Sequence, residues 1–171
     1  QHDITVSALR ARKYKKDVLI VDVGTGSGCL AITAKIEWPE IEVYATEINE
    51  DALKIAKKNA TKLGADVKFY QGNLLEPIYV LRPPLFALLC NLPYVPDSHP
   101  INKAAKQEPK IAIFGGEDGL DLYRDLFKQV QSEERRAKSE VRPSYILTES
   151  LPFQHTELTK IAKQQGYKLV Q

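Results

Sequence analysis

The stretch that decides the fold is Val18–Cys29, which reads VLIVDVGTGSGC. Its first part, Val18–Val23, is apolar except for Asp22 and rich in β-branched residues, a pattern typical of a strand buried on both faces of a parallel sheet. Glycines at alternate positions of Gly24–Gly28 follow, and they allow the backbone to turn sharply and to approach a ligand closely. The apolar spacing of Cys29–Ile36 then indicates a helix. The stretch therefore predicts a strand, a glycine loop and a helix in direct succession.

Outward from this stretch, short apolar runs alternate with helical patterns along the chain. Further strands are expected at Ile41–Thr46, Val67–Tyr70, Leu85–Cys90, Tyr145–Thr148 and Tyr167–Val170. Further helices are expected at Asp51–Leu63, Leu120–Arg136 and Thr156–Gln165. Strands that alternate with helices predict an α/β fold, with a doubly wound (Rossmann-like), mostly parallel sheet and helices on both of its faces.

Two segments depart from this alternation. Leu74–Pro84 contains three prolines, so a full helix is not expected there. Leu92–Asp118 has no clear helix or strand pattern, and a connection of that length is usually a functional loop. In parallel sheets, ligands lie beyond the carboxyl ends of the strands, near the point where the strand order reverses. Functional residues are therefore expected directly after strands.

Composition narrows the class of protein. The 171 residues suit a single domain spanning 1–171. Lysine and arginine number 24 against 22 acidic residues, and a net charge of +2 is too small to establish nucleic-acid binding by bulk electrostatics. No apolar run is long enough to cross a membrane, and no signal-peptide pattern opens the chain. Cys29 and Cys90 have neither metal-ligand nor disulfide spacing, which favours a reduced, cytoplasmic protein without a metal site.

The glycine loop carries an acidic partner at the next strand end. A phosphate-binding P-loop is excluded because no Lys-Ser/Thr pair follows, and the dinucleotide pattern would require glycine or alanine where Cys29 stands. Glu47 ends the second strand, 19 residues after Gly28, where a carboxylate can accept hydrogen bonds from ribose hydroxyls. Asn73 follows the third strand and can bond a purine edge. The alternative is a plain strand–turn–helix beside a solvated acid.

This arrangement resembles the class I S-adenosylmethionine-dependent methyltransferases. The resemblance implies that Asp22 lies near the amino-acid end of the cofactor, that Glu47 holds the ribose, and that Asn73 lies by the adenine, where the family commonly has aspartate. The cofactor-binding residues implied in this way are Asp22, Gly24, Thr25, Gly26, Gly28, Glu47, Ile48, Asn73, Leu74 and Asn91.

The fourth expected strand is followed directly by Asn91-Leu92-Pro93-Tyr94. This motif resembles the Asn-Pro-Pro-Tyr of methyltransferases that act on planar nitrogens. An amide nitrogen is a poor nucleophile because its lone pair is delocalised, and a site can help by accepting hydrogen bonds from its N–H groups. The resemblance assigns the acceptors to the side-chain oxygen of Asn91 and the carbonyl of Leu92, and it places the Tyr94 ring against the substrate. The catalytic set is then Asn91, Leu92, Pro93 and Tyr94, although Asn91 could instead only cap the strand.

The next segment resembles one family more specifically. Glu108-Pro109-Lys110, the glycine-rich stretch Ala112–Leu120 and Tyr123-Arg124 are similar to the protein-(glutamine-N5) methyltransferases of the HemK/PrmC family, which modify peptide chain release factors. Lys110 stands where that family usually has arginine. Glu149 and Gln154 resemble a glutamate–glutamine pair after the fifth strand. The resemblance implies methyl transfer to the side-chain amide of a glutamine, with the Gly-Gly-Gln loop of a release factor as the substrate and partner.

Two other functions stay open on the sequence. Ribosomal RNA adenine dimethylases share Asn-Leu-Pro-Tyr, so a nucleic-acid adenine-N6 methyltransferase is one alternative. A catalytically silent cofactor-binding fragment is the other, because the chain begins at Gln1, contains no methionine, and lacks the N-terminal recognition domain and seventh strand that the resemblance implies. A six-stranded sheet, or one completed by a neighbouring molecule, is therefore expected. The basic run Arg10–Lys16 is interpreted as a solvated face or a linker, with contact to nucleic acid as the alternative.

Overall fold

The computed structural model describes residues 18–81, 85–103, 105–137 and 142–170. Its strands form one sheet of five in the order β3-β2-β1-β4-β5, and every neighbouring pair is parallel. The strands are β1 (Leu19–Val23), β2 (Glu42–Glu47), β3 (Lys68–Gln71), β4 (Ala87–Cys90) and β5 (Tyr145–Thr148). This sheet confirms the predicted α/β, doubly wound fold. The strand order reverses between β1 and β4, which is where such sheets bind ligands.

The helices lie between the strands, close to the expected positions. They are α2 (Cys29–Glu37), α3 (Glu50–Leu63), α4 (Glu76–Tyr79), α5 (Asp121–Ala137) and α6 (His155–Gln164), with short 3₁₀ turns η1 (Ala105–Gln107), η2 (Lys110–Ala112) and η3 (Pro152–Gln154). Within the described part of the proline-rich segment, residues 74–81, the single turn α4 is the one helix, as the prolines predict. Among the described residues, none of the helices has the length and apolar content that a membrane span requires.

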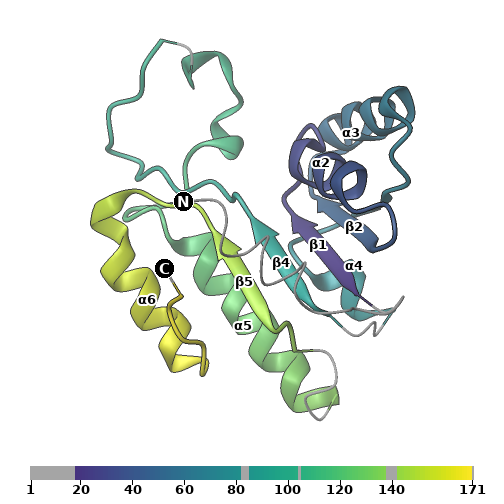
Figure 1. Cartoon of the computed structure of the whole chain (residues 1–171). Coiled ribbons are helices and arrows are strands. Elements are labelled where there is room, and N and C mark those ends of the chain that lie inside the picture. The colour runs from purple at the N-terminus through teal and green to yellow at the C-terminus, as the bar shows by residue number, and fades with distance from the viewer. Residues whose placement is uncertain (1–17, 82–84, 104, 138–141, 171) are drawn as a thin grey trace.

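The helices cover both faces of the sheet, as Figure 1 shows. On one face, Ala31 and Ala34 of α2 pack against Val43 and Ala45 of β2. On the other face, α4, α5 and α6 enclose the larger core, whose buried members include Val21, Leu88, Tyr123, Leu126 and Ile161. These faces alternate along each strand because successive side chains point to opposite sides of a sheet.

The expected sixth strand at Tyr167–Val170 is absent from the described residues, and the prediction of a six-stranded sheet is wrong for them. Gly166, with φ +76°, turns the chain after α6, and the Tyr167 amide donates back to the carbonyl of Ala162. The Tyr167 ring packs edge-on against Phe127, and its hydroxyl donates to the carbonyl of Pro143. Tyr167 therefore closes the core over α5 instead of starting a strand. The basic run Arg10–Lys16 lies outside the described residues.

The described residues of the long connection between β4 and α5 contain no regular helix or strand beyond η1 and η2, as predicted. Its two ends are joined by a short stem, in which the Val95 amide donates to Ile113 and the Gly115 amide donates to Val95, each at 3.0 Å. The amide of Asp97 also donates to the carbonyl of Gly116 at 3.0 Å. Figure 1 shows the loop above this stem extending away from the sheet.

Candidate active site

The carboxylate of Asp22 lies at the end of β1 and organises the glycine loop. It is only 2% exposed. Its Oδ2 accepts a hydrogen bond from the Thr25 hydroxyl at 2.5 Å and another from the Ala31 amide of α2 at 3.0 Å. The second bond satisfies one of the amides that the first turn of a helix leaves without a partner. Asp22 therefore joins β1, the loop and α2.

Burial also changes the acidity of Asp22. Loss of hydration raises its pKa from 3.8 to about 6, against the opposing effect of the bonds from Thr25 and Ala31. The nearby negative charge of Glu47 raises the pKa further. The site thus contains one carboxyl group that changes charge within a unit or so of neutral pH.

Glu47 ends β2 and faces the same loop. Its Oε2 accepts from the Gly26 amide at 2.9 Å, and its Oε1 accepts from the Asn49 amide at 2.8 Å. Two backbone donors from different segments fix the orientation of the carboxylate. Each oxygen has a second lone pair, so both can accept a further hydrogen bond. Ile48, the next residue, has an apolar side chain that is 54% exposed.

The glycine loop has the backbone that the sequence predicts. Gly24, Gly26 and Gly28 all have positive φ, at +70°, +56° and +86°. A Cβ at Gly24 would lie 3.0 Å from the side chain of Leu92, so the loop lies directly against the segment that follows β4. A Cβ at Gly26 would meet nothing within 4 Å, so open space adjoins the loop at that position.

The residues after β3 have side chains that are less available to a ligand than that of Glu47. The Asn73 side chain is half-buried and donates to Glu76 Oε1 at 3.1 Å, which leaves its own oxygen able to accept. Leu74 has a positive φ of +50°, and its side chain is buried in the larger core. A contact from Leu74 to a ligand would therefore come from its backbone. The Gly72 amide donates to the carbonyl of Glu47, which holds the end of β3 beside that of β2.

The predicted catalytic segment Asn91–Tyr94 leaves the carboxyl end of β4. Asn91 is exposed, Leu92 is buried in the larger core, and Pro93 and Tyr94 are half-buried. The Asn91 side chain makes no hydrogen bond to any described residue. The Tyr94 hydroxyl donates to Glu149 Oε1 at 3.0 Å, and partial burial and this carboxylate raise the pKa of Tyr94.

The glycine-rich stretch before α5 packs closely on this segment. A Cβ at Gly115 would lie 2.3 Å from the carbonyl oxygen of Pro93, and one at Gly119 would lie 2.1 Å from that of Tyr94. Both glycines are needed because two backbones meet there without room for a side chain. The glycine-rich stretch after η2 and the Asn91–Tyr94 segment after β4 therefore pack together as one unit.

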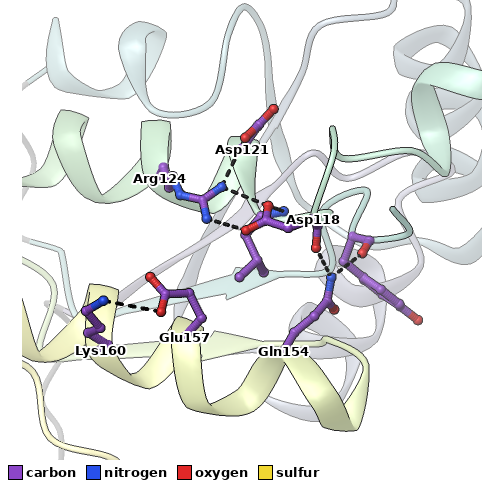
Figure 2. Close-up of polar contacts among 8 residues, drawn as sticks. Asp118, Asp121, Arg124, Gln154, Glu157 and Lys160 are labelled. Atoms are coloured by element: carbon purple, nitrogen blue, oxygen red, sulfur yellow. Dashed lines mark hydrogen bonds and ion pairs between the residues drawn. The ribbon is translucent and has the colours of Figure 1, made fainter. Parts of the chain in front are cut away.

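Asp118 stabilises the turn that leads into the N-terminus of α5. Its Oδ1 accepts from the Leu120 amide at 3.0 Å, as expected for a residue at a helix start. It also forms a two-pronged ion pair with Arg124, which in addition reaches Asp121 (Figure 2). The guanidinium of Arg124 lowers the pKa of Asp118 to about 2.

Two contacts of this site were not predicted from the sequence. The buried Gln154 side chain donates to the backbone carbonyls of Tyr94 and Asp118, and the Tyr123 hydroxyl lies against the last carbonyl of β4. The resemblance drew attention to both residues but gave no role for either. Among the described residues, no group of three or more histidine, cysteine, aspartate or glutamate side chains could hold a metal ion.

The sequence is similar to curated proteins that share one name. Release factor glutamine methyltransferase of Bacillus anthracis is 41% identical over 114 residues, which is 65% of this chain and 40% of that protein. The protein of the same name from Koribacter versatilis is 40% identical over 129 residues, 73% of this chain and 45% of that protein. The chain spans less than half the length of these relatives.

Solved structures agree with the fold. The N-terminal domain of human METTL16, in complex with SAH, superposes with a TM-score of 0.60 at 15% identity, covering 94% of this chain and 57% of that one. A methyltransferase from Pyrococcus furiosus gives 0.58 at 14% identity, covering 97% and 72%.

The family model described as "Methyltransferase small domain" matches residues 3–107, a range that includes the glycine loop, Glu47 and the Asn91–Tyr94 segment. More than half of the sequence is matched, and the parallel sheet carries these residues at neighbouring strand ends, so the chain belongs to the methyltransferase small domain family.

Proposed function

We propose that the chain transfers a methyl group from S-adenosylmethionine to the side-chain amide nitrogen of a glutamine in a protein, the Gly-Gly-Gln loop of a peptide chain release factor. Relatives at about 40% identity carry the name release factor glutamine methyltransferase. Because the chain spans about 40% of their length, the activity is proposed from its own residues together with that name.

The residues present fit the cofactor. Glu47 offers two fixed carboxylate oxygens with lone pairs to spare, which suits the hydroxyl groups of a ribose. Gly26 borders open space, and the exposed apolar side chain of Ile48 offers a surface for a flat purine. Asp22 supplies negative charge at the end of β1, which suits the amino group of the cofactor. In this assignment Thr25 acts indirectly, by bonding Asp22.

One observation carries the assignment of the reaction. The side-chain amide of Asn91 is exposed and makes no hydrogen bond to any described residue. The segment that carries it packs against the glycine loop at Leu92. The side-chain oxygen of Asn91 can accept one N–H of the target amide, while the Leu92 carbonyl accepts the other. Both bonds strengthen as positive charge develops on the nitrogen during transfer. The bound cofactor supplies an electrophilic methyl group, and the methylated nitrogen then loses one proton to water.

The proposal sets the reaction in the cytoplasm, because Cys29 and Cys90 are both free thiols and such thiols persist in reducing compartments. In this proposal residues 1–171 form a single cofactor-binding and catalytic domain, and the release factor is the protein partner.

The test measures transfer from radiolabelled S-adenosylmethionine to three acceptors: a release factor, its variant with the Gly-Gly-Gln glutamine replaced by alanine, and ribosomal RNA. We expect label only on the release factor that keeps the Gly-Gly-Gln glutamine.

Asn91→Ala should lower kcat about 100-fold or more, since the target amide loses an acceptor that acts in the transition state. Glu47→Ala should weaken cofactor binding in calorimetry by about tenfold or more, since hydrogen bonds to a charged group are lost.

The matched control is Lys160→Ala, which removes an exposed ion pair with Glu157 on α6 and should leave both measurements unchanged. Label on RNA alone, or equal label on the glutamine-substituted release factor, would refute the proposal.

A further inference from the structure

The Asn91–Tyr94 segment is held at its start by a buried hydroxyl from α5. Tyr123 is fully buried, and its Oη lies 2.9 Å from the carbonyl oxygen of Cys90, the residue directly before Asn91. The same Oη lies 2.6 Å from the carbonyl oxygen of Glu149, directly after β5. One hydroxyl therefore joins the carboxyl ends of β4 and β5. Burial raises the pKa of Tyr123, so the hydroxyl keeps its proton for this contact.

The end of the segment is held by a buried amide from η3. Gln154 is 3% exposed. Its Nε2 donates to the carbonyl oxygens of Tyr94 and Asp118, both at 2.7 Å, and its Oε1 accepts from the Leu151 amide at 2.8 Å. Both N–H groups of the side chain are used, so its orientation is fully determined. Figure 2 shows Gln154 pointing from the η3–α6 region towards Asp118.

The partners of Gln154 are themselves fixed. Asp118 is held by its ion pair with Arg124 on α5. Gly119 leaves the space that the amide fills, since a Cβ there would lie 2.5 Å from Gln154 Nε2. The position of the Tyr94 carbonyl is thus fixed by Gln154, which is fixed through Asp118 by Arg124 of α5. None of these contacts involves the glycine loop.

We propose that Tyr123 and Gln154 are positioning residues that hold the two ends of the Asn91–Tyr94 segment and thereby set the rate of methyl transfer. This inference rests on the proposed function, because the segment between the two anchors carries the acceptors for the target amide. A displacement of about 1 Å at a reacting group can cost about 100-fold in rate. The hydrogen bonds of the two anchors go to residues other than Glu47 and Gly26, so the Kd for the cofactor should change little when either anchor is replaced.

The test compares Tyr123→Phe, Gln154→Met and the double variant with the wild-type chain, using release factor as acceptor. Each single substitution keeps the approximate shape of the side chain and removes its hydrogen bonds. For Tyr123 these are the contacts with Cys90 and Glu149, and for Gln154 they are the bonds with Tyr94, Asp118 and Leu151. We expect kcat to fall roughly 10- to 100-fold in each, with the Kd for S-adenosylmethionine changed less than about twofold. The fold reduction in kcat of the double variant should be smaller than the product of the two single reductions. The reason is that a segment already released at one end is held only weakly in position by the other anchor.

The control is Arg142→Ala. Arg142 bonds Glu134 at the far end of α5 and the carbonyl of Gln165, and it lies over the Tyr167 ring. Its loss should destabilise the fold and leave kcat unchanged at temperatures where the protein stays folded. A structural effect alone would give the anchor variants this same pattern.

Hydrogen exchange provides a measurement that needs no turnover. The amides of Val95, Asp97 and Gly115 form the stem next to Tyr94. They should exchange about tenfold faster in Gln154→Met than in Arg142→Ala, because release of the Tyr94 carbonyl loosens the stem. Unchanged kcat and unchanged exchange in both anchor variants would overturn the inference. If the wild-type chain labels no release factor, the proposed function fails, and faster stem exchange alone then decides whether the anchors hold the segment.

Discussion

Asp22 is a buried carboxyl group whose ionisation opposes folding. Its pKa of about 6 in the folded chain exceeds the ordinary 3.8, so the folded state holds the proton more tightly than the unfolded state does. The stability that this group contributes is complete below about pH 4 and is lost as the pH rises through about 6. Asp22→Asn keeps an oxygen that can accept from Thr25 and Ala31 but cannot ionise. We expect the variant to gain up to about 3 kcal/mol relative to wild type between about pH 4 and pH 7, measured by urea unfolding.

The same variant should bind S-adenosylmethionine more weakly at neutral pH, since the proposed charge near the amino group is lost. Lys160→Ala, which removes an exposed ion pair on α6, is the control and should leave cofactor binding unchanged. A stability difference between Asp22→Asn and wild type that does not vary with pH would contradict the assignment of the raised pKa.

Single residues differ in how far the sequence reveals them. The positions of Asp22, Glu47 and Asn91 could be predicted because each lies at or directly after the carboxyl end of a strand, beside a glycine loop or a proline motif. The contacts of Gln154 could not, because its amide reaches the carbonyl of Tyr94 across 60 residues of sequence. No local pattern records which carbonyl a buried amide will find.

At the scale of elements, the close packing of the glycine-rich stretch on the catalytic segment is testable at Gly119. An alanine there would have a strained φ of +79°, and its Cβ would overlap the Tyr94 carbonyl and the Gln154 amide. We expect Gly119→Ala to lower the free energy of unfolding by roughly 3 kcal/mol or more. Gly64→Ala is the matched control. It has a similar φ of +67° at the end of α3 but open space around the Cβ, so it should cost only about 1 kcal/mol. Equal losses in thermal or urea unfolding would show that the overlap is relieved by a small shift.

Elements with a strong local signal were predicted well. The bounds of β5 agree with the expectation, and α3 ends at Leu63 before Gly64, as its left-handed glycine predicts. Tyr167–Val170 was predicted wrongly because four residues with an aromatic and two aliphatic side chains satisfy a strand pattern equally well. The packing of Tyr167 on Phe127 and Arg142 decided its conformation, and that packing exists only once α5 and α6 have met.

For the whole molecule, the sheet order predicts a gradient of stability. β1 is paired on both sides, by β2 and β4, and all five of its residues are buried. β5 pairs with β4 among the described strands, and its end residues are exposed. Native-state hydrogen exchange should therefore find the amides of β1 about tenfold or more slower than those of β5. Comparable rates in the two strands would mean that the sheet opens as one unit.

The fold class and the edge of the sheet that carries the site followed from the alternation of strands and helices. How the β4–α5 connection folds back could not be predicted, because its stem depends on three backbone hydrogen bonds between residues about twenty positions apart. Those bonds form only where Gly115 and Gly119 allow two backbones to approach.

That stem separates the connection into two parts with different tolerance to change. Below it, the backbone at both ends of the Asn91–Tyr94 segment is held by Tyr123, Gln154 and the glycines. Above it, residues 98–112 begin and end at the same place, so insertions, deletions or an exchanged sequence add only the small entropy of closing a longer or shorter loop. A change of loop length above the stem should therefore disturb the residues below it least, so the two parts of the connection can vary independently in length.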